Sequence, residues 1–135
     1  MDVDLPEVRA EVLAVFERYE AALQAGDLDV LDELFWDDAR VVRVGLDDRQ
    51  DGHAAVRAFR RGQACQSPPR RLHDTVVVTF GTGTAVVTTA FVPTDGSPPG
   101  RQSQTWVRLG GRWLVVVAHV SRPVSDTRQA TDTDP

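Results

Sequence analysis

The chain has 135 residues, 41% hydrophobic and 26% charged, which is enough for one globular domain with a buried core. Its formal net charge of −5 argues against a surface for nucleic acid or anionic membranes. All 15 basic residues are arginine, and the single cysteine is Cys65, so lysine Schiff-base chemistry and an intrachain disulfide are both excluded. With no signal-peptide pattern and no apolar run of membrane-spanning length, we expect a cytoplasmic protein.

The first half of the chain is predicted to be mainly helical. Apolar residues three and four apart, from Val8 to Leu23, indicate one buried helix face, with Pro6 in the first turn and Gly26 as the stop. Asp27 is a suitable N-cap for a second, short helix. The elements expected here are helices over residues 6–25, 28–35 and 53–63 and one strand over residues 40–45.

The second half is predicted to consist almost entirely of strands. Runs rich in Val, Thr and aromatic residues are separated by glycine turns, which is typical of hairpins. The expected strands cover residues 71–80, 84–92, 100–108 and 113–121. The tail over residues 123–135 has little apolar content, so we expect it to be flexible.

This order of elements predicts an α+β fold built as a single domain over residues 1–122. The long amphipathic first helix needs an apolar surface to cover, and a strongly curved, mainly antiparallel sheet provides it. Helices and sheet together are expected to form a cone with one open end, and such a cone can enclose a small-molecule pocket.

Polar residues at alternating positions of the last two strands indicate where such a pocket lies. Gln104 and Trp106 share one face of their strand, and we favour that face as the pocket wall because Trp supplies an apolar surface and Gln orients a polar ligand. On the last strand, His119 and Ser121 alternate with Val115 and Val117 and are expected on one face. A lone His on an apolar face is more often structural than catalytic, and that alternative stays open.

Two further candidates lie in the first half. Tyr19 is on the apolar stripe of the first helix, either as a core residue or as a phenol aimed into the cone as a proton donor. Alternation places Arg43 on the same strand face as Val41, and an inward Arg43 would need an anion such as a substrate carboxylate. Trp36 either closes the mouth of the cone or packs beside it.

Several other polar groups are interpreted as structural or solvated. His53 begins the third helix, where a capping or surface role is as reasonable as a site role. The sequence contains no Gly-x-Ser-x-Gly elbow, no metal-spaced His or acidic cluster and no phosphate loop. The residues expected to be solvated are the pairs Asp37-Asp38 and Asp47-Asp48 and the helix residues Arg57, Arg60 and Arg61.

Short segments spread over residues 5–122 carry a family resemblance. They include Arg18-Tyr19-Glu20-Ala21-Ala22-Leu23, Val42-Arg43-Val44-Gly45, Gly100-Arg101-Gln102-Ser103-Gln104-Thr105-Trp106 and Ala118-His119-Val120-Ser121. In combination with the order of elements, they resemble the AtzH-like family, which includes the HpxZ proteins of oxalurate catabolism. That family belongs to the nuclear-transport-factor-2-like superfamily, together with ketosteroid-isomerase and polyketide-cyclase relatives. The fold that the resemblance implies is the same helix-covered cone, usually paired into dimers.

The resemblance also implies an activity. The AtzH branch is similar to a decarboxylating amidohydrolase that converts 1,3-dicarboxyurea to allophanate without metal or organic cofactor. Its catalytic Tyr and Arg match Tyr19 and Arg43, and Trp36, Gln104, Trp106, His119 and Ser121 are expected to contact the small anionic substrate. Two alternatives stay open: a dimeric accessory domain that binds a pathway amidase or its metabolite, and an isomerase or cyclase. The last needs an acidic base inside the cone, and the later strands offer no candidate.

Overall fold

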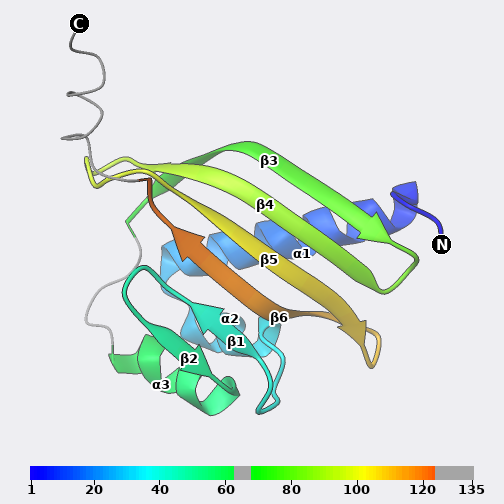
Figure 1. Ribbon diagram of the computed structural model, residues 1–135, viewed down its shortest axis with the longest axis horizontal. Coiled ribbons are helices and arrows are strands. Elements are labelled where there is room, and N and C mark those ends of the chain that lie inside the picture. Colours follow the sequence, from blue (N-terminus) through cyan, green and yellow to red (C-terminus); the bar gives the residue numbers. More distant parts are fainter. Residues whose placement is uncertain (63–67, 124–135) are drawn as a thin grey trace, which may run out of the picture.

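The protein is described by a computed structural model that covers residues 1–62 and 68–123, and it has the predicted α+β fold (Figure 1). Helices pack against one open, mainly antiparallel sheet. The helices are α1 (Pro6–Ala25), α2 (Leu28–Leu34) and α3 (His53–Gly62). The strands are β1 (Val42–Val44), β2 (Arg49–Asp51), β3 (Arg70–Phe80), β4 (Thr84–Pro93), β5 (Gly100–Leu109) and β6 (Arg112–Ser121).

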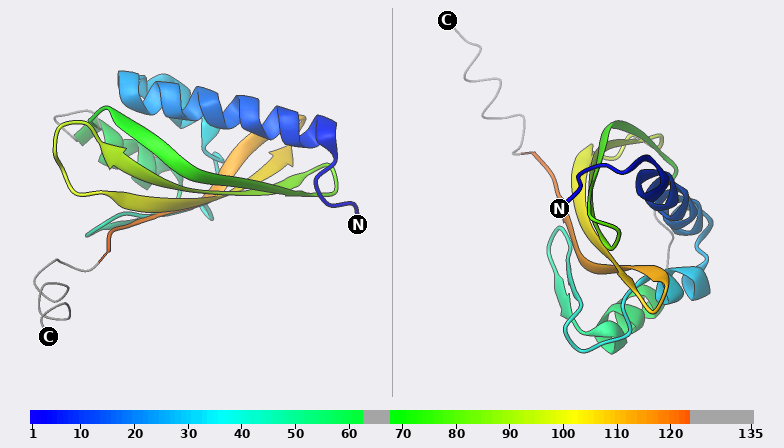
Figure 2. Two further views of the ribbon diagram at one scale, coloured as in Figure 1. Left: turned by 90° about the horizontal axis from the view of Figure 1, so that it is seen from above. Right: turned by 90° about the vertical axis from the view of Figure 1, so that its right-hand side faces the viewer.

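The sheet has six strands in the order β2-β1-β6-β5-β4-β3. Strands β3 to β6 form the predicted antiparallel meander, and β1 joins its edge by pairing parallel to β6. The loop expected after β1 contains an additional strand, β2, which returns antiparallel to β1. Periodicity did not indicate β2 because it has only three residues, Arg49-Gln50-Asp51, all of them polar. Figure 2 shows the sheet curving around α1.

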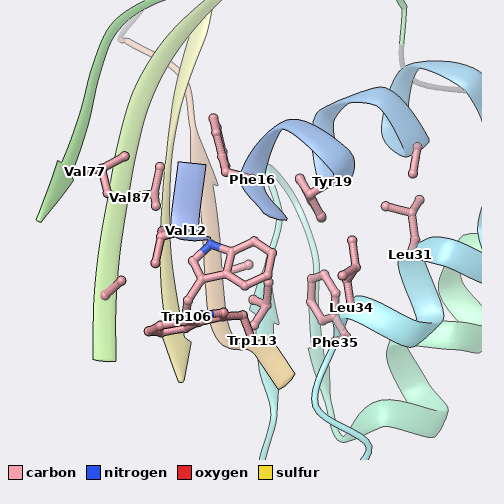
Figure 3. Packing of buried hydrophobic residues seen from close by; sticks show 14 of the residues in the cluster. Val12, Phe16, Tyr19, Leu31, Leu34, Phe35, Val77, Val87, Trp106 and Trp113 are labelled. Atoms are coloured by element: carbon pink, nitrogen blue, oxygen red, sulfur yellow. The ribbon is translucent and has the colours of Figure 1, made fainter. Parts of the chain in front are cut away.

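Helix α1 covers the concave face of the sheet and supplies much of the core. It begins with Pro6 in its first turn and ends at Gly26, whose φ of 70° is the left-handed conformation that glycine adopts most readily. Its buried stripe includes Val12, Phe16 and Tyr19, which pack toward Trp106 of β5 (Figure 3). Burial of this stripe, rather than helix propensity, stabilises the helix.

Helices α2 and α3 close one end of the sheet. The Asp27 side chain accepts a hydrogen bond from the Val30 backbone N–H at 3.3 Å, as expected of an N-cap. Immediately after α2, the Trp36 backbone N–H donates to the Val115 carbonyl of β6 at 3.0 Å. Helix α3 is fixed at its start by the His53 N–H, which donates to the Asp38 carbonyl at 3.1 Å.

Three expectations fall on parts of the chain outside the described residues. These are Gln63 as the end of the third helix, the position of Cys65, and the flexibility of the tail beyond residue 123. Within the described ranges, none of the helices has the length and apolar character needed to cross a membrane.

Gly100, at the start of β5, is a position where the fold leaves no room for a side chain. A Cβ there would lie 2.5 Å from Phe91 Cζ and 2.7 Å from the Ser121 carbonyl oxygen. The oxygen belongs to the paired strand β6 and cannot move without disturbing the sheet. We expect Gly100→Ala to lower the free energy of unfolding by about 1–3 kcal/mol, the usual range for overpacking.

Urea denaturation followed by circular dichroism measures this change. The matched control is Gly83→Ala in the β3–β4 turn, where a Cβ would have no described atom within 4 Å. Equal stability of the two variants would show that the crowding around Gly100 is relieved without cost.

Candidate active site

A cavity of about 310 Å³ lies between α1 and the concave face of the sheet. Helix α1 contributes Tyr19 and Leu23, and the other walls come from strands β1 and β3 to β6 and from the end of α3. Side chains that are far apart in sequence therefore face one space. Polar or ionisable side chains in the wall include Tyr19, Arg43, Arg60, Arg70, Gln102 and Gln104.

Tyr19 lies in the cavity wall with a fixed ring. The side chain is 6% exposed, and its ring packs edge-on against Trp106, with centroids 6.2 Å apart and an interplanar angle of 90°. On another side it contacts Phe35, also at 6.2 Å between centroids (Figure 3). Tyr19 belongs to the hydrophobic core cluster, so packing holds the phenol in the cavity wall.

Arg43 also lines the cavity, which decides between the inward and the surface position that the sequence left open, and it has an internal counter-charge. Its Nη1 donates to Asp48 Oδ1 and to Gln50 Oε1, both at 2.9 Å. The expectation that Asp48 is a solvated turn residue is therefore wrong: it reaches back from the β1–β2 turn to Arg43. Gly45 makes this possible, because a Cβ there would lie 2.4 Å from Asp48 Oδ1.

The two bonds of Arg43 use only one of its nitrogen atoms. Within the described part of the chain, its Nε and Nη2 have no protein partner, and the side chain is 20% exposed. The guanidinium is therefore held by Asp48 and Gln50 while a second edge stays available to a ligand, in the geometry that suits a carboxylate.

A second buried network was not predicted from the sequence. Arg70 of β3 forms a two-pronged ion pair with Glu20 of α1, from Nε at 3.2 Å and from Nη2 at 2.5 Å. Gln102 of β5 joins both groups: its amide donates to Glu20 at 3.2 Å and its carbonyl accepts from Arg70 at 2.9 Å. In the sequence, Glu20 directly follows Tyr19 on the first helix, and this position was the available signal. No pattern in the sequence identified Arg70 as its partner.

Phenylalanine rings support three of the four arginines that line the cavity. Arg43 Cζ lies 4.7 Å from the centroid of Phe59. The corresponding distances are 4.8 Å for Arg60 over Phe35 and 4.4 Å for Arg70 over Phe91. Contact with a ring face stabilises a desolvated guanidinium and leaves its edge, where the N–H donors are, free to bind.

The prediction that Arg57, Arg60 and Arg61 form a solvated face is wrong for Arg60. That residue turns inward and lines the cavity. The other two stay near the surface of α3, where both pair with Asp32 of α2, at 3.2 Å from Arg57 and 2.7 Å from Arg61.

The face of β5 that was favoured as the pocket wall does point inward. Gln104 is 2% exposed and lines the cavity, while Trp106 is fully buried behind it. The Trp106 Nε1–H donates to Gln104 Oε1 at 3.0 Å, which fixes the amide and leaves its NH2 group for other partners. Trp106 is a support for Tyr19 and Gln104 rather than part of the cavity lining.

The expected face of β6 is wrong, because a β-bulge interrupts the alternation. Thr105 pairs with Val117 but Trp106 pairs with Val115, so one residue of β6 is extra. Val115 is buried, whereas Val117 and His119 lie on the exposed side. His119 nevertheless borders the cavity, at its rim.

Ser121, Trp36 and His53 lie away from the cavity lining. Ser121, at the end of β6, pairs with Arg101. Trp36 packs beside the core with Arg40 over its ring at 4.8 Å. The His53 ring is within hydrogen-bonding distance of the Asp32 carbonyl, with Nε2 at 2.8 Å, which is a structural contact between α3 and α2.

The charge of the cavity wall is opposite to that of the whole chain. Among the described residues that line it, every formally charged side chain is an arginine: Arg43, Arg60, Arg70 and Arg122. Asp48 and Glu20 neutralise Arg43 and Arg70 from behind. Within the described ranges, no group of His, Cys, Asp and Glu residues is arranged to hold a metal ion. The cavity therefore suits a small anion.

The arrangement of helices on a curved sheet is the nuclear-transport-factor-2-like fold. A nuclear-transport-factor-2-like protein from Pseudomonas putida KT2440, of unknown function, has the same fold with a TM-score of 0.76. It is 22% identical, and the alignment covers 93% of each chain.

Two other solved structures are much more similar in sequence. One, from Pectobacterium atrosepticum SCRI1043, is a protein of unknown function from the DUF3225 family, with 43% identity and a TM-score of 0.87 over 91% of this chain and 96% of that one. The other, a cystatin-like fold protein from Burkholderia xenovorans LB400, has 42% identity and a TM-score of 0.86 over 93% and 98%. The AtzH-like family model matches residues 1–126, and this chain belongs to the AtzH-like family. Among curated proteins, none matches the chain significantly.

The buried Glu20–Arg70 pair leads to a prediction about stability. The two side chains are 9% and 5% exposed, so removal of one charge leaves the other desolvated and unpaired. Glu20→Gln is expected to lower the free energy of unfolding by about 3–5 kcal/mol, the range for breaking a buried pair.

The exposed pair between Arg18 and Glu33 supplies the control, since its side chains are 50% and 49% exposed. Arg18→Gln should cost no more than about 1 kcal/mol. Chemical denaturation of both variants measures the difference, and similar losses for the two would mean that water reaches the Glu20 carboxylate.

Proposed function

We propose that this protein is a cofactor-free decarboxylating amidohydrolase that converts 1,3-dicarboxyurea, or a closely related ureido acid, to allophanate or its equivalent. The observation that carries the proposal is that Tyr19 and Arg43 line the same cavity. These residues match the two catalytic positions implied by the family resemblance. The arginine-lined wall supports an anionic substrate of this size.

The chemistry follows from the structure of an N-carboxylated urea. The bond between nitrogen and the terminal carboxyl carbon breaks, carbon dioxide leaves, and the electron pair remains on nitrogen and is delocalised onto the central carbonyl oxygen. Arg43 stabilises this developing negative charge, because a fixed cationic donor in a site shielded from water acts most strongly on new charge. The Asp48 and Gln50 contacts hold the guanidinium in place before the substrate arrives.

Tyr19 supplies the proton. Its phenol delivers a proton to the nitrogen that loses the carboxyl group and regains one from water. The hydroxide left by that water combines with the released carbon dioxide, so the net reaction consumes one water and yields allophanate and bicarbonate. Gln104, whose amide orientation is fixed by Trp106, donates to the substrate carbonyl, and His119 at the rim contacts a carboxylate. Packing of Tyr19 against Phe35 and Trp106 keeps the phenol in one orientation, as proximity catalysis requires.

Substitution of each catalytic residue tests the proposal. Tyr19→Phe removes one hydroxyl with almost no change in volume, and Arg43→Lys keeps the charge but loses the forked geometry. Each variant is expected to release carbon dioxide from 1,3-dicarboxyurea about 100- to 1000-fold more slowly, the usual effect of losing one charge-stabilising donor. Circular dichroism should remain that of the wild type.

Two results would count against the proposal in different ways. If the wild-type protein binds ureido acids without turnover above buffer, it is a binding or accessory domain for a pathway amidase. If it is active and both variants keep full activity, the assignment of Tyr19 and Arg43 is wrong.

We also propose that the protein is a homodimer that pairs through the outer face of the sheet. Val76 and Val117 of the meander are 52% and 44% exposed, which is high for valine in a strand. Light scattering at micromolar concentration should give about twice the chain mass of 14.8 kDa. As a check, Val117→Asp should shift the particle toward the monomer, and a monomeric wild type would contradict the proposal.

A further inference from the structure

Arg60 of α3 is a buried cavity arginine that has no counter-charge among the described residues. Its Nε and Nη2 atoms are buried and have no hydrogen-bond partner among the described residues. Its Cζ lies 4.8 Å from the centroid of the Phe35 ring, and the residue lines the same cavity as Tyr19 and Arg43. A buried guanidinium with two unpaired donors is costly in a folded protein, so the arrangement calls for a partner.

The two unpaired atoms form one edge of the guanidinium. In other arginines of this protein, the same edge binds a carboxylate. Arg70 uses the same atoms, Nε and Nη2, to hold the Glu20 carboxylate. Arg40 uses them to hold Asp38, at 2.8 Å and 3.0 Å. In each case the edge receives the two oxygens of a carboxylate, which is the ligand that matches the spacing of a planar fork. In Arg60 the same edge is buried and has no carboxylate partner among the described residues.

The other arginines of the cavity are already balanced or solvated. Asp48 and Glu20 compensate Arg43 and Arg70, and Arg122 is exposed. The positive charge of Arg60 is therefore the part of the cavity that a ligand must neutralise. Contact with Phe35 offsets some of the cost of desolvation but supplies no acceptor for the N–H groups.

We propose that Arg60 binds a second carboxylate of the ligand, so that the cavity selects dicarboxylates over monocarboxylates. The inference rests on the proposed function, in which Arg43 holds the reacting end of the substrate. Arg60 then anchors the end that is retained. Nε and Nη2 are shielded from solvent, so this binding requires a change of the Arg60 rotamer that brings their edge to the cavity.

Binding of glutarate and its monoamide tests this inference without any turnover. The two molecules have nearly the same shape and differ by one carboxylate, and calorimetry measures their affinities. The wild-type protein should prefer glutarate. Arg60→Met, which keeps the length of the side chain and removes the charge, should weaken glutarate binding about ten- to hundredfold, since hydrogen bonds to charged groups have this effect. Its affinity for the monoamide should change little.

Arg57→Met is the matched control, because it removes one positive charge from the same helix at an exposed position outside the cavity lining. It should bind glutarate as the wild type does. Thermal unfolding separates ligand binding from a structural role: without ligand, Arg60→Met should be at least as stable as the wild type, since it removes unpaired buried donors. If that variant does not fold, Arg60→Lys replaces it, and its glutarate affinity should also fall because one ammonium cannot replace the fork.

Glutarate affinity that is unchanged in the Arg60 variant, or that falls equally for the monoamide, would overturn the inference. So would a large loss of stability without ligand. The result of the binding test can be distinguished from the result of the activity test. If glutarate binding depends on Arg60 but 1,3-dicarboxyurea is not turned over, the dicarboxylate site stands and the enzymatic proposal fails. If turnover is present and binding does not depend on Arg60, the reverse holds.

Discussion

Positive charge enclosed between α1 and the sheet constrains this structure more than any other feature. Four arginines line one cavity of about 310 Å³, in a chain whose net charge is −5. Removing a cation from water is expensive unless a counter-charge and hydrogen bonds compensate it. Glu20 of the long helix and Asp48 of a turn supply two of the counter-charges, and phenylalanine rings cover the faces of the arginines.

The ion pairs and hydrogen bonds of these arginines also connect the helices and strands to the cavity. The Glu20–Arg70 pair ties α1 to β3, and Gln102 extends the same network to β5. Because Tyr19 precedes Glu20 directly, the network fixes the part of α1 that carries the phenol. The contact of Arg43 with Asp48 and Gln50 holds the β1–β2 hairpin to the cavity wall in the same way. The buried charges that stabilise the fold therefore adjoin the cavity, as is common where charges are buried at functional sites.

Membership of the AtzH-like family identifies the fold and the relatives, whereas the geometry of the cavity indicates which class of ligand it can hold. The family model and the solved relatives define the fold and the relationship, but the Pectobacterium relative is itself a protein of unknown function. The substrate class must be argued from the wall of the cavity. A wall with arginines, a fixed phenol and a fixed amide suits a small anion with a polar centre, and an N-carboxylated urea has both properties.

The sequence by itself determined the elements whose periodicity extends over several turns or many strand residues. The 3.6-residue stripe of α1, its Pro and Gly ends, the four long strands and the inward face of Gln104 and Trp106 were all predicted correctly. These features follow from local patterns, because burial of one face imposes a repeat on the chain. The motif segments were sufficient to recognise the family.

Tertiary structure alone decided the features that depend on contacts between distant residues. The strand β2 is too short and polar to leave a periodic signal, and the extra residue in β6 moved His119 to the rim although the sequence alternates without a break. Arg60 resembled its solvated neighbours, and only the fold turned it onto Phe35. Which group pairs with an inward arginine depends on the segments that the fold brings together. Glu20 and Arg70, for example, are 50 positions apart in the sequence.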